Sequence, residues 1–415
     1  MSAVLSERPA AAEPAFREVW LVSLGHALTH WYPATFYILL PLIGAELGLT
    51  YSQIGLIMSC QSIAGAVSNI PGGIAVDMVG RKGTLLVLSL FWIGFPYLLM
   101  GFTNSYWPLL LCISLVGIGN NLWHPAAIPT LANRFPTRKA FVLSIHGMGG
   151  NMGDALAPLA IGGLLALLSW REIVVVNLLP GVVIGCLILV YLGTWRMIDE
   201  GKQGDKAPKK AQSFAEYGSS VLAFIKDRAC GVLMATSVFR SATQAALMTF
   251  LPIFLAHDMG YSPFAVGASL FALQAAGFAA GPIAGHLSDR MGPRRILMSS
   301  MGMSGAILLF MAISGASPAF VFFIALLGFF LYATRPVIQA WVLEAAPKNI
   351  GGTSIGLMFG FQSLGGAIAP ALAGLLADAY GLGAVFYFIA ATILIANLLC
   401  FAMPRGSGMA GAKPA

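Results

Sequence analysis

Twelve apolar stretches, each long enough to cross the hydrocarbon core of a bilayer, make up most of this 415-residue chain. A helix needs about 20 apolar residues to span a core of roughly 30 Å. Hydrophobic residues form 58% of the chain and charged residues only 9%, which excludes an ordinary soluble domain. We predict an all-α polytopic membrane protein with spans at residues 18–46, 52–76, 83–102, 107–133, 140–168, 172–195, 229–256, 263–287, 296–315, 318–345, 352–378 and 383–403.

The basic residues test this assignment independently, because Lys and Arg accumulate on the cytoplasmic side of membrane proteins. With a cytoplasmic N-terminus, all 23 Lys and Arg residues fall on that side except Arg171, in an outer connection, and Arg240 and Arg335, inside spans. The formal charge of +7 is therefore a topology signal and does not indicate a nucleic-acid partner. We expect a multi-pass protein of the bacterial inner membrane, embedded in the lipid bilayer as a functional monomer, with both termini cytoplasmic.

One polar signature occurs twice in this apolar chain, as GIAVDMVGRK at residues 73–82 and GHLSDRMGPRR at residues 285–295. A carboxylate followed by a glycine turn and a basic cluster is typical of a short, water-exposed connection. Each copy lies between apolar runs, so we interpret both as loops between membrane helices.

The repeat extends beyond this signature. Gly55 and Gly267 share its 212-residue offset, and so do Pro158 and Pro370. The chain is therefore a duplication of a six-helix unit, and an even number of helices gives both copies the same orientation, about an axis along the membrane normal. The predicted domains are an N-terminal tail (1–17), a first bundle (18–195), a linker with a short amphipathic helix (196–228), a second bundle (229–403) and a C-terminal tail (404–415).

Polar side chains deep inside the spans are the candidates for substrate chemistry, because charge is expensive in lipid and usually faces a cavity. At about 1.5 Å per residue, five histidine and arginine side chains lie about 12–18 Å from the cytoplasmic ends of four spans. Each belongs to a polar stripe at helical spacing. The predicted substrate-binding residues are His26, His30, Tyr37, Asn121, His124, Arg240, Gln244, Tyr332, Arg335 and Gln339.

Structural interpretations of these residues stay open. The ring of His124 can satisfy a carbonyl freed by Pro125, and His26 and His30 can bond helix backbones. The arginines are harder to explain in this way, because a guanidinium is always charged. Asp154, the only carboxylate near mid-membrane, is either a salt-bridge partner of one arginine or a proton carrier. The proton-coupling candidates are Asp154, His30 and His124.

The G-x-x-x-D-x-x-G-R-K signature, its weaker second copy, the twelve spans and the central linker resemble the major facilitator superfamily over essentially the full length. Within it, VGIGNNLWHPAAIPTLANRF followed by HGMGGNMGDALAPL is similar to the fosmidomycin-resistance type of exporter. APLAIGG stands where the antiporter pattern of the fifth helix has GPxxGG, and Asp154 is a further departure. The resemblance implies two six-helix halves around a central cavity, lined by the spans that carry the polar groups.

The resemblance also implies that the two signatures are latches of the outward-open state. Asp77 and Asp289 stand at cytoplasmic helix ends, where a carboxylate can pair with nearby basic residues and oppose a neighbouring helix end. The alternative is that both only terminate helices. The predicted gating residues are Gly73, Asp77, Gly80, Arg81, Lys82, Gly285, Asp289, Gly292, Arg294 and Arg295.

Two guanidiniums and up to three imidazoles against one carboxylate predict a small anionic substrate or drug. The sequence contains no phosphate-binding loop for ATP, which favours coupling to protons. We expect a secondary active transporter, and specifically a proton-driven exporter. A proton-coupled importer of an organic anion and a non-transporting sensor or scaffold remain as alternatives. We expect no enzyme activity, because nucleophile–base pairings and cofactor loops are missing, and no cofactor or metal, because no metal-ligand spacing is visible.

Overall fold

The computed structural model describes residues 16–79, 82–192, 219, 222–224, 226–314, 319–346 and 351–403, and this part of the chain contains helices and turns but no strand. The first half contributes α1 (Arg17–Leu47), α2 (Tyr51–Val79), α3 (Lys82–Met100), α4 (Tyr106–Arg134), the 3₁₀ turn η1 (Pro136–Arg138), α5 (Lys139–Leu164), α6 (Trp170–Val176) and α7 (Leu178–Leu192). The second half contributes α9 (Arg228–His257), α10 (Pro263–Met291), α11 (Pro293–Ser314), α12 (Ala319–Ala345), α13 (Gly351–Tyr380) and α14 (Gly383–Phe401).

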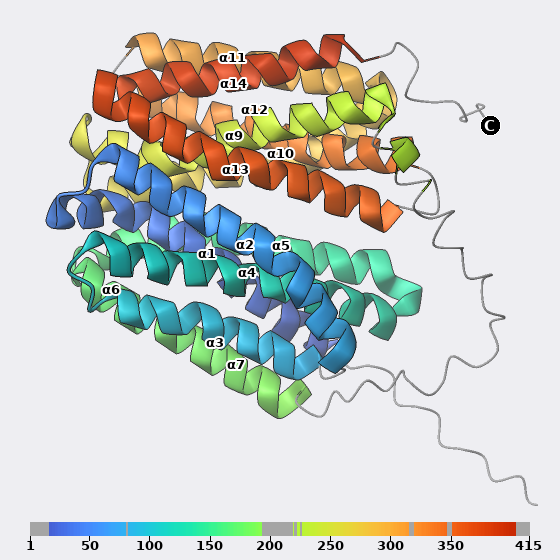
Figure 1. Cartoon of the computed structure of the whole chain (residues 1–415), viewed down its shortest axis with the longest axis horizontal. Coiled ribbons are helices and arrows are strands. Elements are labelled where there is room, and N and C mark those ends of the chain that lie inside the picture. The colour runs from blue at the N-terminus through green and yellow to red at the C-terminus, as the bar shows by residue number, and fades with distance from the viewer. Residues whose placement is uncertain are drawn as a thin grey trace, which may run out of the picture.

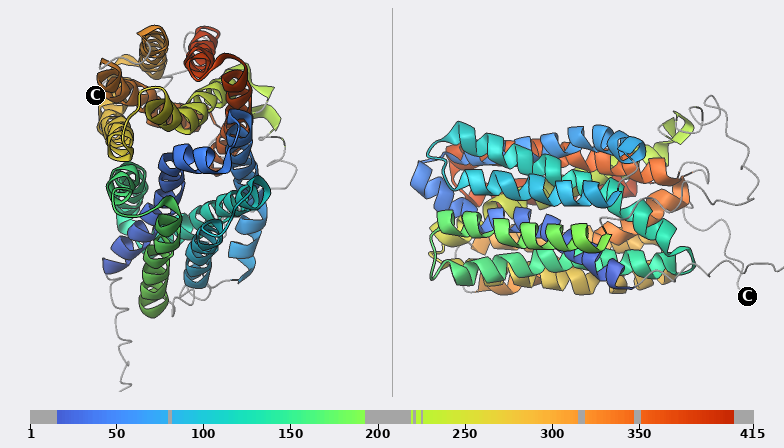
Figure 2. Two further views of the ribbon diagram at one scale, coloured as in Figure 1. Left: turned by 90° about the vertical axis from the view of Figure 1, so that its left-hand side faces the viewer. Right: turned by 90° about the horizontal axis from the view of Figure 1, so that it is seen from below.

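These helices form two bundles that lie side by side, with their axes roughly along one direction (Figure 1). The left view of Figure 2 looks along the helices and shows α9–α14, coloured yellow to red, beside α1–α7. Counting α6 and α7 as one interrupted span, the fold has the twelve membrane-spanning helices that the sequence predicts. Within the described residues, nine segments are long and apolar enough to span a membrane by length and composition alone.

Most helix ends lie close to the predicted ones, and the eighth span shows the clearest difference. It was expected to end at residue 287, but α10 continues to Met291. Gly292 ends the helix with a φ of 87°, a conformation that glycine adopts readily and other residues rarely do. Asp289 therefore lies in the last turn of the helix and not in the connection after it.

The sixth span follows the predicted apolar run 172–195 as one helical stretch, Trp170–Tyr191. A single irregular residue, Asn177, separates α6 from α7 and keeps helical dihedral angles. Pro180 supplies the cause, since proline lacks an N–H and its ring collides with the carbonyl four residues earlier. The groups at Asn177 find partners in α1, because the Tyr32 hydroxyl donates to the Asn177 carbonyl at 2.8 Å and the Trp31 indole N–H donates to its side-chain oxygen at 2.7 Å.

The halves meet closely at the end of the bundle where α1 ends and α2 begins, which we call the distal end. The opposite end, which carries η1 and Gly292, is the proximal end. A side chain at Gly55 of α2 would collide with the backbone carbonyl of Pro370 in α13, and one at Gly267 of α10 would collide with that of Pro158 in α5. Glycine at both positions allows this close backbone approach.

These two contacts are related by the duplication. Gly55 and Gly267 are equivalent positions of the repeat, as are Pro158 and Pro370, and each glycine touches the proline of the other half. One turn further on, Gly162 of α5 lies against the start of α10, and Gly374 of α13 lies against the start of α2. The interface at the distal end is therefore two-fold symmetric in its backbone contacts.

One polar contact at the distal end breaks this symmetry. The carboxylate of Asp378, near the end of α13, accepts hydrogen bonds from the backbone N–H groups of Tyr51 at 2.8 Å and Ser52 at 2.9 Å, and from the Ser52 hydroxyl. These N–H groups belong to the first turn of α2 and have no partner within their own helix. The equivalent residue of the first half, Ala166, has no carboxylate. Asp378 thus holds the second half against the first with a cap that only one side provides.

Replacing Asp378 by Ala is expected to weaken closure of the distal end by about 1 kcal/mol, the usual contribution of a helix cap, which shifts an open–closed equilibrium roughly fivefold. Spin labels placed across the distal end, in a background free of the five native cysteines, should show a larger long-distance population by electron–electron resonance. Glu172→Ala is the matched control, because Glu172 caps α6 through Ser169 within a single half. An unchanged distance distribution in Asp378→Ala would show that the cap does not hold the halves together.

Candidate functional site

Close packing of α1 against α5 places the histidine-bearing face of α1. Side chains at Gly149 and Gly153 would collide with the backbone carbonyls of Ser23 and Ala27. Small residues four positions apart let two membrane helices approach to backbone contact. Between them, Gly150 faces the rings of His26 and His30, with His26 Cε1 only 2.7 Å from where a side chain at Gly150 would begin.

Four histidines meet at this contact. His26 is buried. Its Nδ1 lies 2.6 Å from the backbone carbonyl oxygen of His146 in α5, and its Nε2 lies 3.2 Å from Nε2 of His124 in α4. The His26 and His146 rings stack with their centroids 4.0 Å apart, and the rings of His26 and His30 meet edge to face at 4.8 Å. Three predicted site residues from two helices are therefore in contact.

Asp154 lies at the edge of this cluster. Its Oδ2 is 2.9 Å from Nδ1 of His30, and both side chains are partly exposed. Among the residues that the structure describes, Asp154 forms this pair and no salt bridge with Arg240 or Arg335, so the salt-bridge alternative left open by the sequence does not hold in this conformation. Asp154 also interacts electrostatically with Tyr37 of α1 and with Tyr332 of α12, in the other half.

Among the described cations of the second half, Arg240 of α9 is the most deeply buried. Only 3% of its surface is exposed. Its Nε donates to the Thr334 hydroxyl at 3.2 Å, and its guanidinium lies 6.0 Å from the ring centroid of Tyr332. Its Nη2 has no hydrogen-bond partner in the described part of the chain. A buried charged donor without a partner is costly, so this guanidinium is a candidate anion-binding group.

The remaining predicted residues of the second half lie on α9 and α12, the helices that carry Arg240 and its partner Thr334. Arg335 of α12 is half-buried and interacts electrostatically with Arg240 and, across the halves, with His124. Gln244 donates to the Tyr332 hydroxyl at 3.2 Å. Gln339 is half-buried one helical turn beyond Arg335. Arg335 of α12 is thus within electrostatic range of both Arg240 of α9 and His124 of α4.

Asn121 is the predicted residue that the structure places elsewhere. Its amide donates to the Gly117 carbonyl at 3.1 Å, within α4, and its side chain fills the space opposite Gly65 of α2. Such contacts belong to the packing between α2 and α4. The polar stripe of α4 therefore turns one of its members away from His124.

The predicted latches are only partly visible. Gly73, Asp77, Gly80, Arg81 and Lys82 lie outside the residues whose side chains the structure describes. In the second copy, Asp289 is exposed and has no ion-pair partner among the described residues. Gly285 and Arg295 flank it without a polar contact to it, and Arg294 donates instead to the Phe401 carbonyl of α14 at 3.0 Å. Among the described residues, this conformation therefore shows no ion pair of Asp289 with Arg294 or Arg295, and the latch of the outward-open state stays a prediction.

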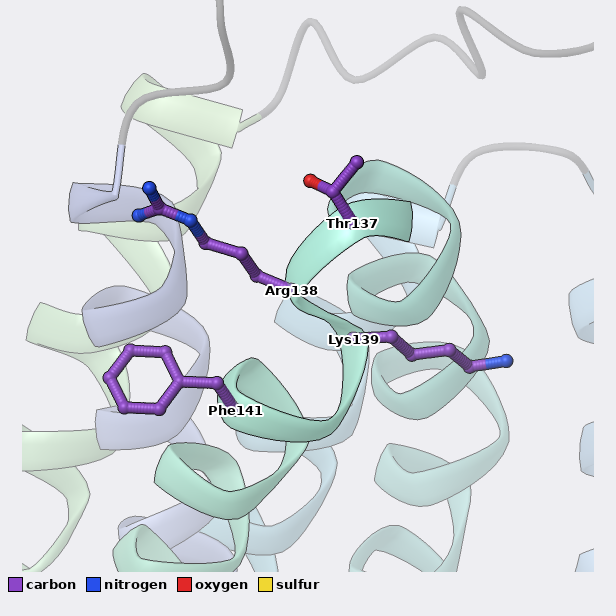
Figure 3. A pocket seen from close by; sticks show the side chains of 4 residues that line it. All are labelled: Thr137, Arg138, Lys139 and Phe141. Atoms are coloured by element: carbon purple, nitrogen blue, oxygen red, sulfur yellow. The ribbon is translucent and has the colours of Figure 1, made fainter.

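An open depression of about 460 Å³ lies at the proximal end, where η1 joins α5 (Figure 3). Thr137, Arg138, Lys139 and Phe141 line it. The side chains of Arg138 and Lys139 point in opposite directions (Figure 3), so no two charges converge on one ligand. This depression therefore lacks the convergent polar groups that mark a binding site.

Sequence reasoning missed two polar residues of the candidate site. His146 precedes Asp154 by eight positions, close to two helical turns, which places both on the α1-facing side of α5. This spacing could have indicated that His146 lies near Asp154. Thr334, the partner of Arg240, carried no signal, because a threonine inside an apolar helix usually bonds its own backbone, as Thr334 also does through the Leu331 carbonyl.

Comparisons with known proteins agree with this architecture. The family model described as Major Facilitator Superfamily matches residues 20–229 and 232–414. The chain is 27% identical to a hexuronate transporter of Bacillus subtilis (strain 168), over 87% of this chain and 86% of that protein. It is 24% identical to the fosmidomycin resistance protein of Escherichia coli (strain K12), over 94% and 93%. It superposes, with a TM-score of 0.81 at 17% identity, on a bacterial homolog of the human lysosomal transporter Spinster in an inward-facing, unoccupied conformation, over 93% and 96% of the two chains.

Proposed function

The chain belongs to the major facilitator superfamily and is a transporter and not an enzyme, and on this basis we propose that it exports a small anionic compound in exchange for protons. The site lies between the halves, where alternating access exposes it to each side in turn. In this proposal the proximal end faces the cytoplasm, as the distribution of basic residues predicts.

The observation that carries the anionic substrate is the Nη2 group of Arg240. A guanidinium that is 97% buried keeps its charge, and the described residues provide no carboxylate to neutralise it. Arg335 adds a second positive charge within interaction range. A carboxylate, phosphonate or phosphate ester would satisfy both through charge-assisted hydrogen bonds, whereas a cation would be repelled.

The named relatives support an acidic substrate and leave two directions of transport. One is named for a hexuronate, which is a carboxylate. Another is named for resistance to fosmidomycin, which favours export. We propose export because the sequence elements of the fourth and fifth helices resemble that type. Import of an organic anion with protons is the second candidate, favoured by the hexuronate relative.

Proteoliposomes with an acidic exterior distinguish these functions, because proton exchange drives an anion out whereas proton symport drives it in. Vesicles preloaded with labelled glucuronate, a phosphonate or a cation such as choline should release the anions faster under the gradient, and a protonophore should abolish the difference. Accelerated uptake of external anion would establish the importer instead. Transport of the cation alone would contradict the anionic site.

A further inference from the structure

We propose that His26, His30 and His124, called here the histidine trio, bind a divalent late first-row metal ion, and that the transported anion is recognised as a chelate of this ion. The metal site follows from the geometry of the trio alone. The chelate rests, in addition, on the proposed transport of anions.

The spacing of the trio fits one metal ion. One ring nitrogen from each histidine lies within 4.8 Å of those of the other two. The His26 and His124 Nε2 atoms are 3.2 Å apart. Two nitrogen ligands of a tetrahedral zinc ion, each about 2.0–2.1 Å from the metal, are separated by about 3.3 Å. His30 lies one helical turn from His26 on the same face of α1 and is partly exposed, so its ring has room to complete the set.

The outer nitrogens are already oriented for metal binding. Nδ1 of His26 faces the His146 carbonyl, which only accepts hydrogen bonds, so this nitrogen carries the hydrogen and Nε2 carries the lone pair. Nδ1 of His30 faces the Asp154 carboxylate in the same way. Metal-bound histidines usually donate their second N–H to a carbonyl or carboxylate, which fixes the ring and raises its basicity. Two of the three rings therefore have the supporting partner that a metal site requires.

The type of ligand selects the metal. Imidazole suits zinc, copper, nickel and cobalt, whereas calcium and magnesium require oxygen ligands. Three protein ligands leave an open coordination position, and three neutral imidazoles place no negative charge on the ion itself, since Asp154, within the described residues, pairs only with the His30 ring. An anion that chelates the ion would fill that position, and Arg335, within electrostatic range of His124, would take its remaining negative charge together with Arg240.

A titration of the purified, tag-free, metal-stripped protein with Co²⁺ tests the metal site without any transport measurement. We expect one ion per chain, with the strong visible absorption of a low-coordinate cobalt ion, and displacement by Zn²⁺. His30→Gln and His124→Gln should lower the affinity at least tenfold, and Asp154→Asn should lower it about 10–100-fold through the ring it supports. His257→Gln, which alters an exposed histidine outside the trio, should bind as the unchanged protein does.

The same samples show whether a variant has unfolded. Zn²⁺ should raise the melting temperature of the unchanged protein and of His257→Gln, because a ligand of the folded state stabilises it, and at the same concentration should raise that of the folded His30→Gln and His124→Gln variants less. If Co²⁺ does not bind saturably, or binds equally well to the trio variants, His26 and His124 share only a hydrogen bond and the metal site is refuted.

Transport of two anions into proteoliposomes tests whether the substrate is recognised as a metal chelate. Citrate chelates metal ions strongly, and acetate binds them only weakly. Zn²⁺ should stimulate citrate transport at least tenfold and acetate transport little, and EDTA should reverse this. Equal citrate transport with and without metal would overturn the chelate while leaving anion transport established. Failure of both anions under all conditions would refute the proposed function, and the Co²⁺ titration would still decide the metal site.

Discussion

Replacing Arg240 by Gln should reduce anion binding and transport by about 30-fold or more, because removing one member of a buried ionic contact costs about 2–5 kcal/mol. Glutamine retains a polar group beside Thr334 but no charge for the substrate. The measurement is binding of the transported anion to purified protein, together with its flux in proteoliposomes. Arg240→Lys should restore part of the affinity, since an ammonium keeps the charge and loses the fork of donors.

The same position makes a prediction of opposite sign for stability. The unpartnered guanidinium destabilises the folded protein when no substrate is bound. Arg240→Met should therefore raise the melting temperature and abolish transport. Arg290→Gln, which removes an exposed arginine at the end of α10, controls for charge and should change neither property. If Arg240→Met lowers stability and Arg240→Gln transports normally, Arg240 is a structural residue and the anionic site lies elsewhere.

Alanine at Gly55 or Gly267 is expected to hold the distal end open. Its methyl group would occupy the position of a carbonyl oxygen of the other half, and neither backbone can yield without separating α2 from α13 or α5 from α10. Overpacking of this kind costs about 1–3 kcal/mol, which shifts the conformational equilibrium about 5- to 150-fold. Labelling of a cysteine at the distal end by a membrane-impermeant maleimide should accelerate accordingly, and transport should fall.

Gly281→Ala and Gly360→Ala are the matched controls, because an added methyl group there meets no atom within 4 Å. Gly281 lies in α10, as Gly267 does, and Gly360 lies in α13, the helix that Gly55 contacts. Both substitutions should leave labelling and transport unchanged. Equal labelling of Gly55→Ala and Gly360→Ala would show that the symmetric backbone contacts do not control closure. Because Gly55 and Gly267 are related by the repeat, both substitutions should have similar effects.

The helices could be predicted closely from sequence, because the membrane imposes length and apolarity on each span. The predicted span 107–133 and α4 (Tyr106–Arg134) differ by one residue at each end. The irregular residue Asn177 was not predicted, because hydropathy does not report that a proline such as Pro180 leaves a backbone carbonyl without its helical N–H partner. The end of α10 was also not predicted, because its last turn is polar and resembles a loop in the sequence. The helix end is defined only by the positive φ of Gly292.

Depth along each span could also be read from sequence, whereas rotation about the helix axis could not. Depth placed His26, His124 and Arg240 at one level. Rotation decides which neighbours a side chain meets, and it is set by the contacts of α5 with α1 at Gly149 and Gly153. For this reason the pairing of Asp154 with His30 stayed open. The trio stayed hidden as well, because His124 lies 98 positions from His26 along the chain and only the fold brings the two together.

The duplication placed one proline at equivalent points of α4 and α12, and the residue before it is now His124 in one half and Arg335 in the other. Two identical halves would present the same group twice and would suit a ligand whose two ends are alike. In the proposed site, an imidazole of the first half and a guanidinium of the second would give the ligand a fixed direction, with its metal-binding head toward the first half and its acidic tail toward the second. Enantiomers and positional isomers of one acid should therefore be distinguished, although the frame that holds them is symmetric.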